Sequence, residues 1–176
     1  LGGPTGQRCR DLLTHDDGLA PIVVNSESPT RVILTVLTEG TTQQTAFFDP
    51  DPTITDEEAA AILDRVEQAL AHDEVSALTL SGSSPSPATH GLYSDLISLA
   101  LARRIPVFLD TYGPSLDAIW GFWPTSIQVN RKEAAGRLRK ETITDDDVLK
   151  LLADWDRHRV SVGVVTDGPN PALFKI

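Results

Sequence analysis

Polar and acidic residues follow several apolar runs of this sequence, at the points where strands would end. The four segments that follow such runs are Ser81-Gly82-Ser83-Ser84, Asp110-Thr111-Tyr112-Gly113, Asn130-Arg131-Lys132-Glu133 and Thr166-Asp167-Gly168. In an open parallel sheet, ligands bind beyond the carboxyl ends of the strands. Hydroxyl, amide and carboxylate oxygens there suit an oxygen-rich ligand and a hard cation such as Mg²⁺. Each of these residues could instead be an ordinary turn or helix-cap residue.

The sequence around these segments alternates between helical and strand patterns. Apolar residues at helical spacing predict four helices, over 4–17, starting near 53, over 89–103 and starting after Thr144. Thr55 and Glu58 form a capping-box pattern at the start of the helix near residue 53. Apolar runs predict strands at 21–24, 75–80, 106–109, 126–129 and 160–165. Strands joined through helices indicate right-handed crossovers, and hence an α/β fold with a mainly parallel sheet covered on both faces.

One segment does not fit this alternation. Residues 30–37 and 43–48 are rich in β-formers and flank a turn at 38–41, which predicts a β-hairpin. Because apolar residues occupy alternate positions of residues 32–37, we expect at least one face of the hairpin to be covered. We interpret residues 30–48 as a small flap separate from the main sheet.

Composition narrows the possible partners. The 176 residues carry 25 Asp and Glu against 15 Lys and Arg, a net charge of −10. This charge repels phosphate backbones, so we expect neither nucleic-acid nor membrane binding, although local arginines could still hold a small phosphorylated ligand. No apolar run reaches the roughly 18 residues of a membrane helix. The lone Cys9 cannot form an internal disulfide, which favours the cytoplasm.

From Gly2 to Leu173, the chain resembles the PfkB (ribokinase-like) carbohydrate kinases, in the branch with 6-phosphofructokinase-2, 1-phosphofructokinase and tagatose-6-phosphate kinase. The similarity is carried by short motifs in the order of the family. They are GGPTG at 2–6, TR at 30–31, LSGSSP at 80–85, LDTYG at 109–113, VNRKE at 129–133 and VVTDG at 164–168. The resemblance implies a three-layer α/β/α sandwich with a β-hairpin lid at 30–48, and phosphoryl transfer from ATP to a hydroxyl of a phosphosugar with Mg²⁺.

The resemblance also implies roles for individual residues. Arg31 matches the lid residue that grips the phosphate of the sugar, and its planar guanidinium suits phosphate oxygens. Ser83 matches a second substrate contact at a strand end. The alternatives are an exposed arginine on a strand edge and an ordinary turn serine.

Four further residues match the nucleotide-binding side of the family. Asn130 and Glu133 match the N-x-x-E motif, which organises Mg²⁺ near the triphosphate, with Glu133 closest to the metal. Thr166 and Gly168 match the turn beside the nucleotide. The alternative for Asn130 and Glu133 is a purely structural capping box at a helix start.

The chain also departs from the family pattern. Gln128 stands where members usually carry a lysine, and Pro171 where they usually carry glycine. The aspartate base of the family is expected beyond Ile176, so we assign no catalytic residue and interpret residues 1–176 as the central portion of a ribokinase-like domain, inactive alone. The competing hypotheses are a non-catalytic phosphosugar or nucleotide sensor and an unrelated doubly wound signalling domain. A homodimer through the lid is expected by resemblance.

Overall fold

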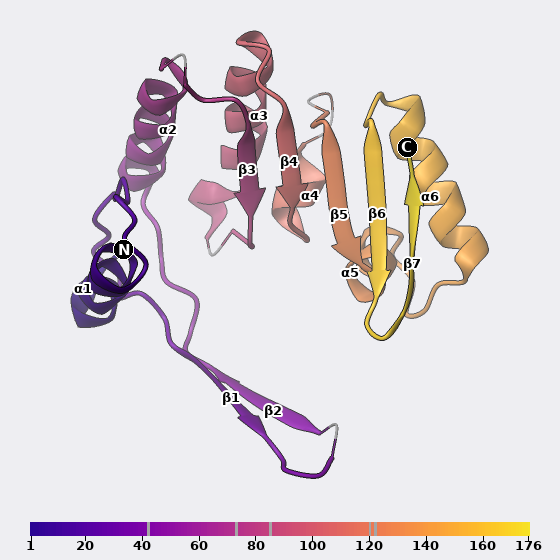
Figure 1. The fold of residues 1–176 in the computed structure, drawn as a ribbon, viewed down its shortest axis with the longest axis horizontal. Helices are drawn as coiled ribbons and strands as arrows, with labels where there is room; N and C mark the ends of the chain where they lie inside the picture. Colours follow the sequence, from indigo (N-terminus) through magenta and orange to yellow (C-terminus); the bar gives the residue numbers. More distant parts are fainter. Residues whose placement is uncertain (42, 73, 85, 120, 122) are drawn as a thin grey trace. The chain divides into compact units, whose positions relative to one another are not determined.

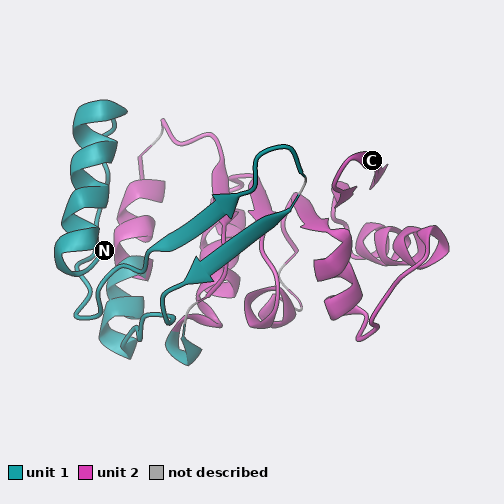
Figure 2. Cartoon of the chain, turned by 90° about the horizontal axis from the view of Figure 1, so that it is seen from below, with its two compact units in different colours: residues 1–62, 85–88 teal, residues 63–84, 89–176 magenta. Residues whose placement is uncertain are grey.

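The computed structural model describes residues 1–41, 43–72, 74–84, 86–119, 121 and 123–176. The chain divides into two compact units, coloured separately in Figure 2. Unit 1 comprises residues 1–62 and 85–88, and unit 2 comprises residues 63–84 and 89–176. Helix α2 (Asp56–Leu70) contributes its first residues to unit 1 and the remainder to unit 2.

Unit 1 begins with helix α1 (Gly3–Asp11), which continues into a π-helical turn (Leu12–Asp16). The strand that we predicted at 21–24 is wrong, because no strand forms between α1 and the hairpin. Instead the Leu1 nitrogen donates to the Val24 carbonyl (2.8 Å), and the Ser26 N–H donates to the Leu1 carbonyl (3.0 Å). The first residue of the chain thus satisfies backbone groups that a neighbouring strand would otherwise pair.

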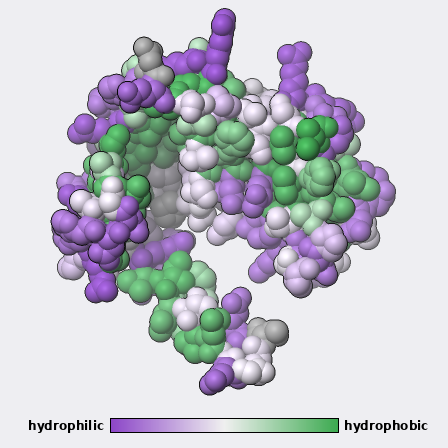
Figure 3. All heavy atoms as spheres, viewed as in Figure 1, coloured by the Kyte–Doolittle hydropathy of each residue, from purple (hydrophilic) through white to green (hydrophobic). Residues whose placement is uncertain are grey.

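The predicted hairpin is present as β1 (Ile33–Leu37) and β2 (Gln44–Phe48), paired antiparallel with Leu34 opposite Phe47. The expected cover on one of its faces is wrong, because every residue of both strands is exposed in the described structure. Both faces carry large apolar side chains, and the surface of the hairpin in Figure 3 is largely hydrophobic. Alternation along a strand shows which residues share a face, and it does not supply the element that would cover them.

The capping box predicted at the start of α2 is confirmed. The Glu58 N–H donates to Thr55 Oγ1 (3.2 Å), and the Thr55 N–H donates to Glu58 Oε2 (3.1 Å). The Glu27 N–H also donates to Glu58 Oε1 (2.7 Å). These bonds, led by the one from Glu27, lower the pKa of the Glu58 carboxyl. One carboxylate therefore ties the loop after α1 to the start of α2.

Unit 2 is built on a five-stranded sheet with the order β3-β4-β5-β6-β7. The strands are β3 (Leu78–Ser81), β4 (Val107–Asp110), β5 (Ser126–Asn130), β6 (Val162–Asp167) and β7 (Asn170–Lys175). All neighbours pair in parallel except β7, which runs antiparallel to β6 (Figure 1). The helices are α3 (Leu92–Ala102), α4 (Pro114–Ala118), α5 (Arg131–Arg137) and α6 (Asp145–Arg157). The α/β class, the mainly parallel sheet and the hairpin confirm the predicted fold class.

The core of unit 2 lies between one face of the sheet and its helices. Leu80, Leu109 and Ile127 occupy register positions in line with Gly163, and all four are buried. Apolar residues of α3, α5 and α6 belong to the same buried cluster. The opposite face of the sheet is more open, and Phe108 at its centre is 43% exposed. None of the helices within the described residues is long and apolar enough to cross a bilayer.

Gly163 sets the distance between β6 and α6. A Cβ atom built on this residue would lie 2.8 Å from Leu152 Cδ2 and 3.0 Å from Trp155 Cε3. Both neighbours are almost completely buried, so they have little space in which to move. The absence of a side chain at position 163 is therefore what lets α6 pack closely on the sheet.

We predict that Gly163→Ala lowers the free energy of unfolding by about 1–3 kcal/mol, because overpacking forces the buried side chains of α6 to shift. Urea unfolding followed by circular dichroism measures this change. Gly136→Ala is the matched control, since nothing lies within 4 Å of a Cβ at this helical position. The control should be neutral or stabilising by up to about 1 kcal/mol. Equal midpoints for the two variants would contradict the packing argument.

Candidate functional site

Four of the predicted site residues meet at the carboxyl edge of β5 and β6. Asn130 ends β5, and its register partner across the parallel pair is Thr166 of β6. Glu133 lies in the first turn of α5, directly after β5. Gly168 follows β6 in the turn to β7, with φ of +55°, a left-handed conformation that favours glycine. The sheet topology therefore brings the two motifs of the predicted nucleotide side together.

Asn130 and Glu133 form a reciprocal capping box. The Glu133 N–H donates to Asn130 Oδ1 (2.9 Å), and the Asn130 N–H donates to Glu133 Oε2 (2.8 Å). The structural alternative that we considered for this pair is thus realised. The other carboxylate oxygen of Glu133, Oε1, has no hydrogen-bond partner among the described residues, so capping leaves one oxygen for a ligand.

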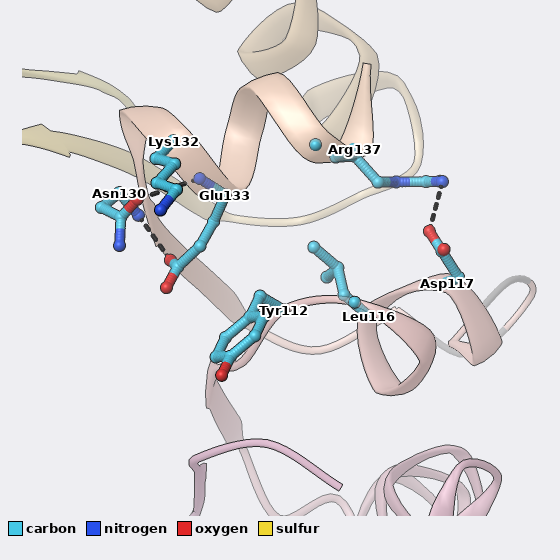
Figure 4. A pocket seen from close by; sticks show the side chains of 9 residues that line it. Tyr112, Leu116, Asp117, Asn130, Lys132, Glu133 and Arg137 are labelled. Atoms are coloured by element: carbon cyan, nitrogen blue, oxygen red, sulfur yellow. Dashed lines mark hydrogen bonds and ion pairs between the residues drawn. The ribbon is translucent and has the colours of Figure 1, made fainter. Parts of the chain in front are cut away.

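A cavity of about 500 Å³ opens beside this pair. Figure 4 shows Asn130, Lys132 and Glu133 along one side of it, with Tyr112 across from Glu133. Gln128 stands where the family pattern has a lysine, so this position brings no positive charge. Lys132 supplies a cation at the cavity instead, from within the same motif. Gln128 lines a different hollow, of about 220 Å³, over the strands β3 to β5.

The same cavity is bounded by an ion pair between two helices. Arg137 Nη1 of α5 lies 2.9 Å from Asp117 Oδ1 of α4. Leu116 contributes an apolar surface between this pair and Tyr112 (Figure 4). The wall thus combines an ion pair, an aromatic ring and an aliphatic side chain. Its other cation is Lys132, for which no ion pair is found among the described residues. Such a lining suits a ligand with both a flat apolar part and an anionic part.

Arg131 holds the turn after β6 against the two neighbouring helices. Its Nε lies 3.0 Å from Asp167 Oδ2, its Nη2 lies 2.5 Å from Asp145 Oδ1, and its Nη1 donates to the Ile143 carbonyl (3.2 Å). The hydrogen bond to Asp145, followed by the charge of Asp167, raises the pKa of the Arg131 guanidinium. This side chain therefore fixes Thr166 and Gly168 relative to Asn130.

Ser83 lies in the loop after β3 and is half-buried. Its loop is tied to the next strand, because the Gly82 N–H donates to the Asp110 carbonyl (2.9 Å) and Thr111 Oγ1 donates to the Gly82 carbonyl (2.6 Å). Strand β4 separates β3 from β5, which places Ser83 about 10 Å along the edge from Asn130. Ser83 thus shares the edge with the other site residues of unit 2. Asn130 and Glu133 line the cavity, and Ser83, Thr166 and Gly168 lie outside its lining.

Arg31 belongs to unit 1, at the base of the hairpin. The residue before it is held firmly, since Thr30 Oγ1 accepts from the Gly2 N–H (3.0 Å) and the Thr30 N–H donates to the Gly2 carbonyl (2.9 Å). The Arg31 guanidinium forms a short ion pair with Asp51. A separate cavity of about 350 Å³ surrounds this pair. Arg31 thus lies in a recess rather than on a bare strand edge.

The donor set suits a magnesium ion that is shared with a nucleotide. Among the described residues, no three His, Cys, Asp or Glu side chains cluster in a way that could hold a metal by themselves. Mg²⁺ is commonly bound through one or two carboxylates together with substrate phosphates and water. Glu133 offers one carboxylate oxygen in the cavity that Lys132 also lines. The residues therefore fit a shared ion and not a cage built from protein alone.

Sequence reasoning missed Lys132, Tyr112 and Asp51. Lys132 stands inside the N-x-x-E motif, so its place next to Asn130 was a signal that we did not use. Tyr112 follows a strand end and carried the same positional signal as its neighbours. Asp51 gave no signal, because it lies 20 residues from Arg31 in sequence and only the closure of the hairpin brings the two together.

Comparison with solved structures shows a close likeness to phosphofructokinases, although no protein-family model matches the sequence. The tetrameric inhibited form of phosphofructokinase-2 from Escherichia coli superposes with a TM-score of 0.83 at 27% identity. The same enzyme in complex with fructose-6-phosphate gives a TM-score of 0.81 at 27% identity. A possible 1-phosphofructokinase from Thermotoga maritima gives 0.85 at 24% identity, which supports the fold alone.

The alignments cover 99% of this chain and between 55% and 57% of the three solved chains. The chain thus spans a little over half the length of the structures that it resembles. The motif resemblance to the PfkB phosphofructokinases is confirmed at the level of structure, and the ribokinase-like fold is shared over almost every residue of this chain.

We predict that Asn130→Ala lowers the free energy of unfolding by about 1 kcal/mol, because the cap of α5 loses its side-chain acceptor. Asn130→Ser is the matched control, since serine caps helices nearly as well and should stay within about 0.5 kcal/mol of the wild type. Urea unfolding of the three proteins measures both values. An Asn130→Ala variant with the same free energy of unfolding as the wild type would show that the capping box contributes nothing to stability.

Proposed function

We propose that residues 1–176 form sugar-phosphate-binding and nucleotide-binding parts of a kinase that transfers a phosphoryl group from ATP to a hydroxyl of a phosphosugar. The observation that carries this proposal is the meeting of the N-x-x-E and T-x-G motifs at one edge of the sheet, where Asn130 and Glu133 line a cavity, in a chain whose fold is similar to that of the phosphofructokinases. The solved E. coli enzyme binds fructose-6-phosphate, which makes this sugar phosphate the first probe.

The nucleotide side is assigned to the edge of β5 and β6. Lys132 provides a cation for the phosphate groups, and the free oxygen of Glu133 would hold Mg²⁺ directly or through water. Thr166 and Gly168 present a hydroxyl and an unobstructed backbone in the adjacent turn. Arg131 keeps that turn in register with Asn130. Phosphoryl transfer depends chiefly on positioning and electrostatic stabilisation, which is what these groups supply.

Two residues are assigned to the sugar, each from its own motif: Arg31 in unit 1 and Ser83 in unit 2. A guanidinium binds phosphate oxygens through paired charge-assisted hydrogen bonds, so Arg31 would hold the phosphate that the sugar already carries. Ser83 offers a hydroxyl and a backbone N–H at a strand end for a sugar oxygen. We assign no catalytic base among the described residues, so binding measurements test these roles more directly than turnover does.

We predict that Arg31→Ala weakens the affinity for fructose 6-phosphate by more than tenfold, because a charge-assisted phosphate contact is lost. Isothermal titration calorimetry measures the dissociation constant. The unfolding midpoint should hardly change, since the partly exposed ion pair with Asp51 contributes little to stability.

The matched control is Arg157→Ala, which removes an equal charge from an exposed pair with Asp154 in unit 2. This variant should bind fructose 6-phosphate like the wild type. Equal affinity of Arg31→Ala and wild type would remove Arg31 from the sugar site.

We further propose that the hairpin mediates self-association. The residues Leu34, Val36 and Phe47 share one of its faces and are 59%, 46% and 58% exposed, while Ile33, Leu37 and Phe48 line the other face. Monomers rarely expose apolar side chains in such continuity, so the surface suits a second copy of the same hairpin. Phosphofructokinase-2 of E. coli, which this chain resembles, has a tetrameric form.

We predict that Phe47→Glu shifts a dimer to monomer in sedimentation velocity experiments, because a charge would be buried in the apolar interface. Leu149→Glu is the control, since Leu149 is also exposed (52%) but lies on α6. A wild-type chain that sediments as a monomer over the whole accessible concentration range would rule out the hairpin interface.

A further inference from the structure

The recess at the base of the hairpin contains acidic side chains beside Arg31. It is lined by residues 28–31 and 49–53, and its titratable groups are the single cation Arg31 and the two carboxylates Asp49 and Asp51. A phosphate that enters this recess therefore meets more negative than positive charge. One of the two carboxylates must leave before the guanidinium can attract a phosphate strongly.

The two aspartates differ in how they are held. Asp49 Oδ2 accepts from the Val32 N–H (2.9 Å), and the Asp49 N–H donates to the Val32 carbonyl (3.1 Å), so Asp49 belongs to the closure of the hairpin. Among the residues that the structure describes, Asp51 has a hydrogen bond only to Arg31. Its side chain is 59% exposed, against 30% for Arg31. Asp51 is thus the carboxylate that a ligand can displace.

The sequence around Asp51 keeps it in place without further contacts. Pro50 and Pro52 flank it, and proline fixes its own φ and restricts the residue before it to extended conformations. On the other side, Thr30 is anchored to Gly2, which holds the backbone beside Arg31. Because both backbones are constrained, forming the ion pair costs little additional backbone entropy.

We propose that Asp51 is an internal counter-anion that occupies Arg31 in the ligand-free protein and is exchanged for the phosphate of the sugar. This inference rests on the role proposed above for Arg31. Asp51 then sets the affinity of the site, because each phosphate that binds must replace a carboxylate on the same guanidinium. It also favours a dianionic phosphate over a singly charged carboxylate ligand, since only the stronger anion gains from the exchange.

The test is the affinity of Asp51→Asn for fructose 6-phosphate, measured by isothermal titration calorimetry. We expect binding about three- to tenfold tighter than wild type, a gain kept modest by the solvent exposure of the pair. Asp49→Asn is the matched control: it removes an equal charge from the same recess and should change affinity by less than about twofold. The gain should vanish in the Arg31→Ala background, and unphosphorylated fructose should show none.

The outcomes separate this inference from the proposed function. Wild-type binding with no gain in Asp51→Asn would overturn the counter-anion role and leave the sugar site in place. An equal gain in Asp49→Asn would also overturn it, because the effect would then be one of general charge. The Asp51→Asn variant leaves the Arg31 guanidinium without its counter-anion. If this variant does not bind fructose 6-phosphate at all, both the inference and the role of Arg31 in sugar binding are overturned.

Discussion

The parallel pairing of β5 with β6 is the constraint on which the candidate site depends. It places Asn130 opposite Thr166, two residues that are 36 positions apart in sequence. The helices α5 and α6 and their loops form the crossover between these strands, and the absence of a side chain at Gly163 lets α6 pack closely on the sheet. Packing in the core thus supports the edge at which the two motifs meet.

Charge in this protein is neutralised locally. Arg131 balances Asp145 and Asp167, Arg137 pairs with Asp117, and Lys140 pairs with Asp147, whose pKa is lowered to about 2 chiefly by that contact. Against this background, Lys132 stands out as a cation directed to a cavity. A chain of net charge −10 that binds anions needs such sites, because its overall field repels them. Five of the eleven arginines pair with nearby acids among the described residues, which leaves those guanidinium groups less able to attract a phosphate.

Arg131 illustrates how a structural ion pair and a functional site become linked. Its guanidinium contacts Asp145 and the Ile143 carbonyl at the start of α6, and it also contacts Asp167, which lies between Thr166 and Gly168, the two residues of this turn assigned to the nucleotide. Glu133 also combines a structural and a proposed functional role. One of its carboxylate oxygens accepts the hydrogen bond of the capping box with Asn130, and the other is available for the proposed metal contact. Capping and ligand binding are therefore compatible roles for these residues, although they first stood as alternatives. The cap would hold Glu133 in the orientation that a ligand requires.

The helices α1, α2, α3 and α6, the hairpin and the strands β3 to β6 followed from the sequence alone, because periodicity and capping patterns are local. The capping boxes at Thr55 and Asn130 needed only residues three positions apart. The wrong predictions concern features that depend on contacts between residues far apart in sequence. Residues 21–24 have the composition of a strand, but no strand forms there and Val24 bonds to Leu1 instead. The apolar hairpin is exposed on both faces. The contact of Arg31 with Asp51 and the cavity lined by Lys132 and Tyr112 exist only after the chain has closed on itself. Sequence spacing determines which residues share an element, whereas tertiary packing decides which elements meet.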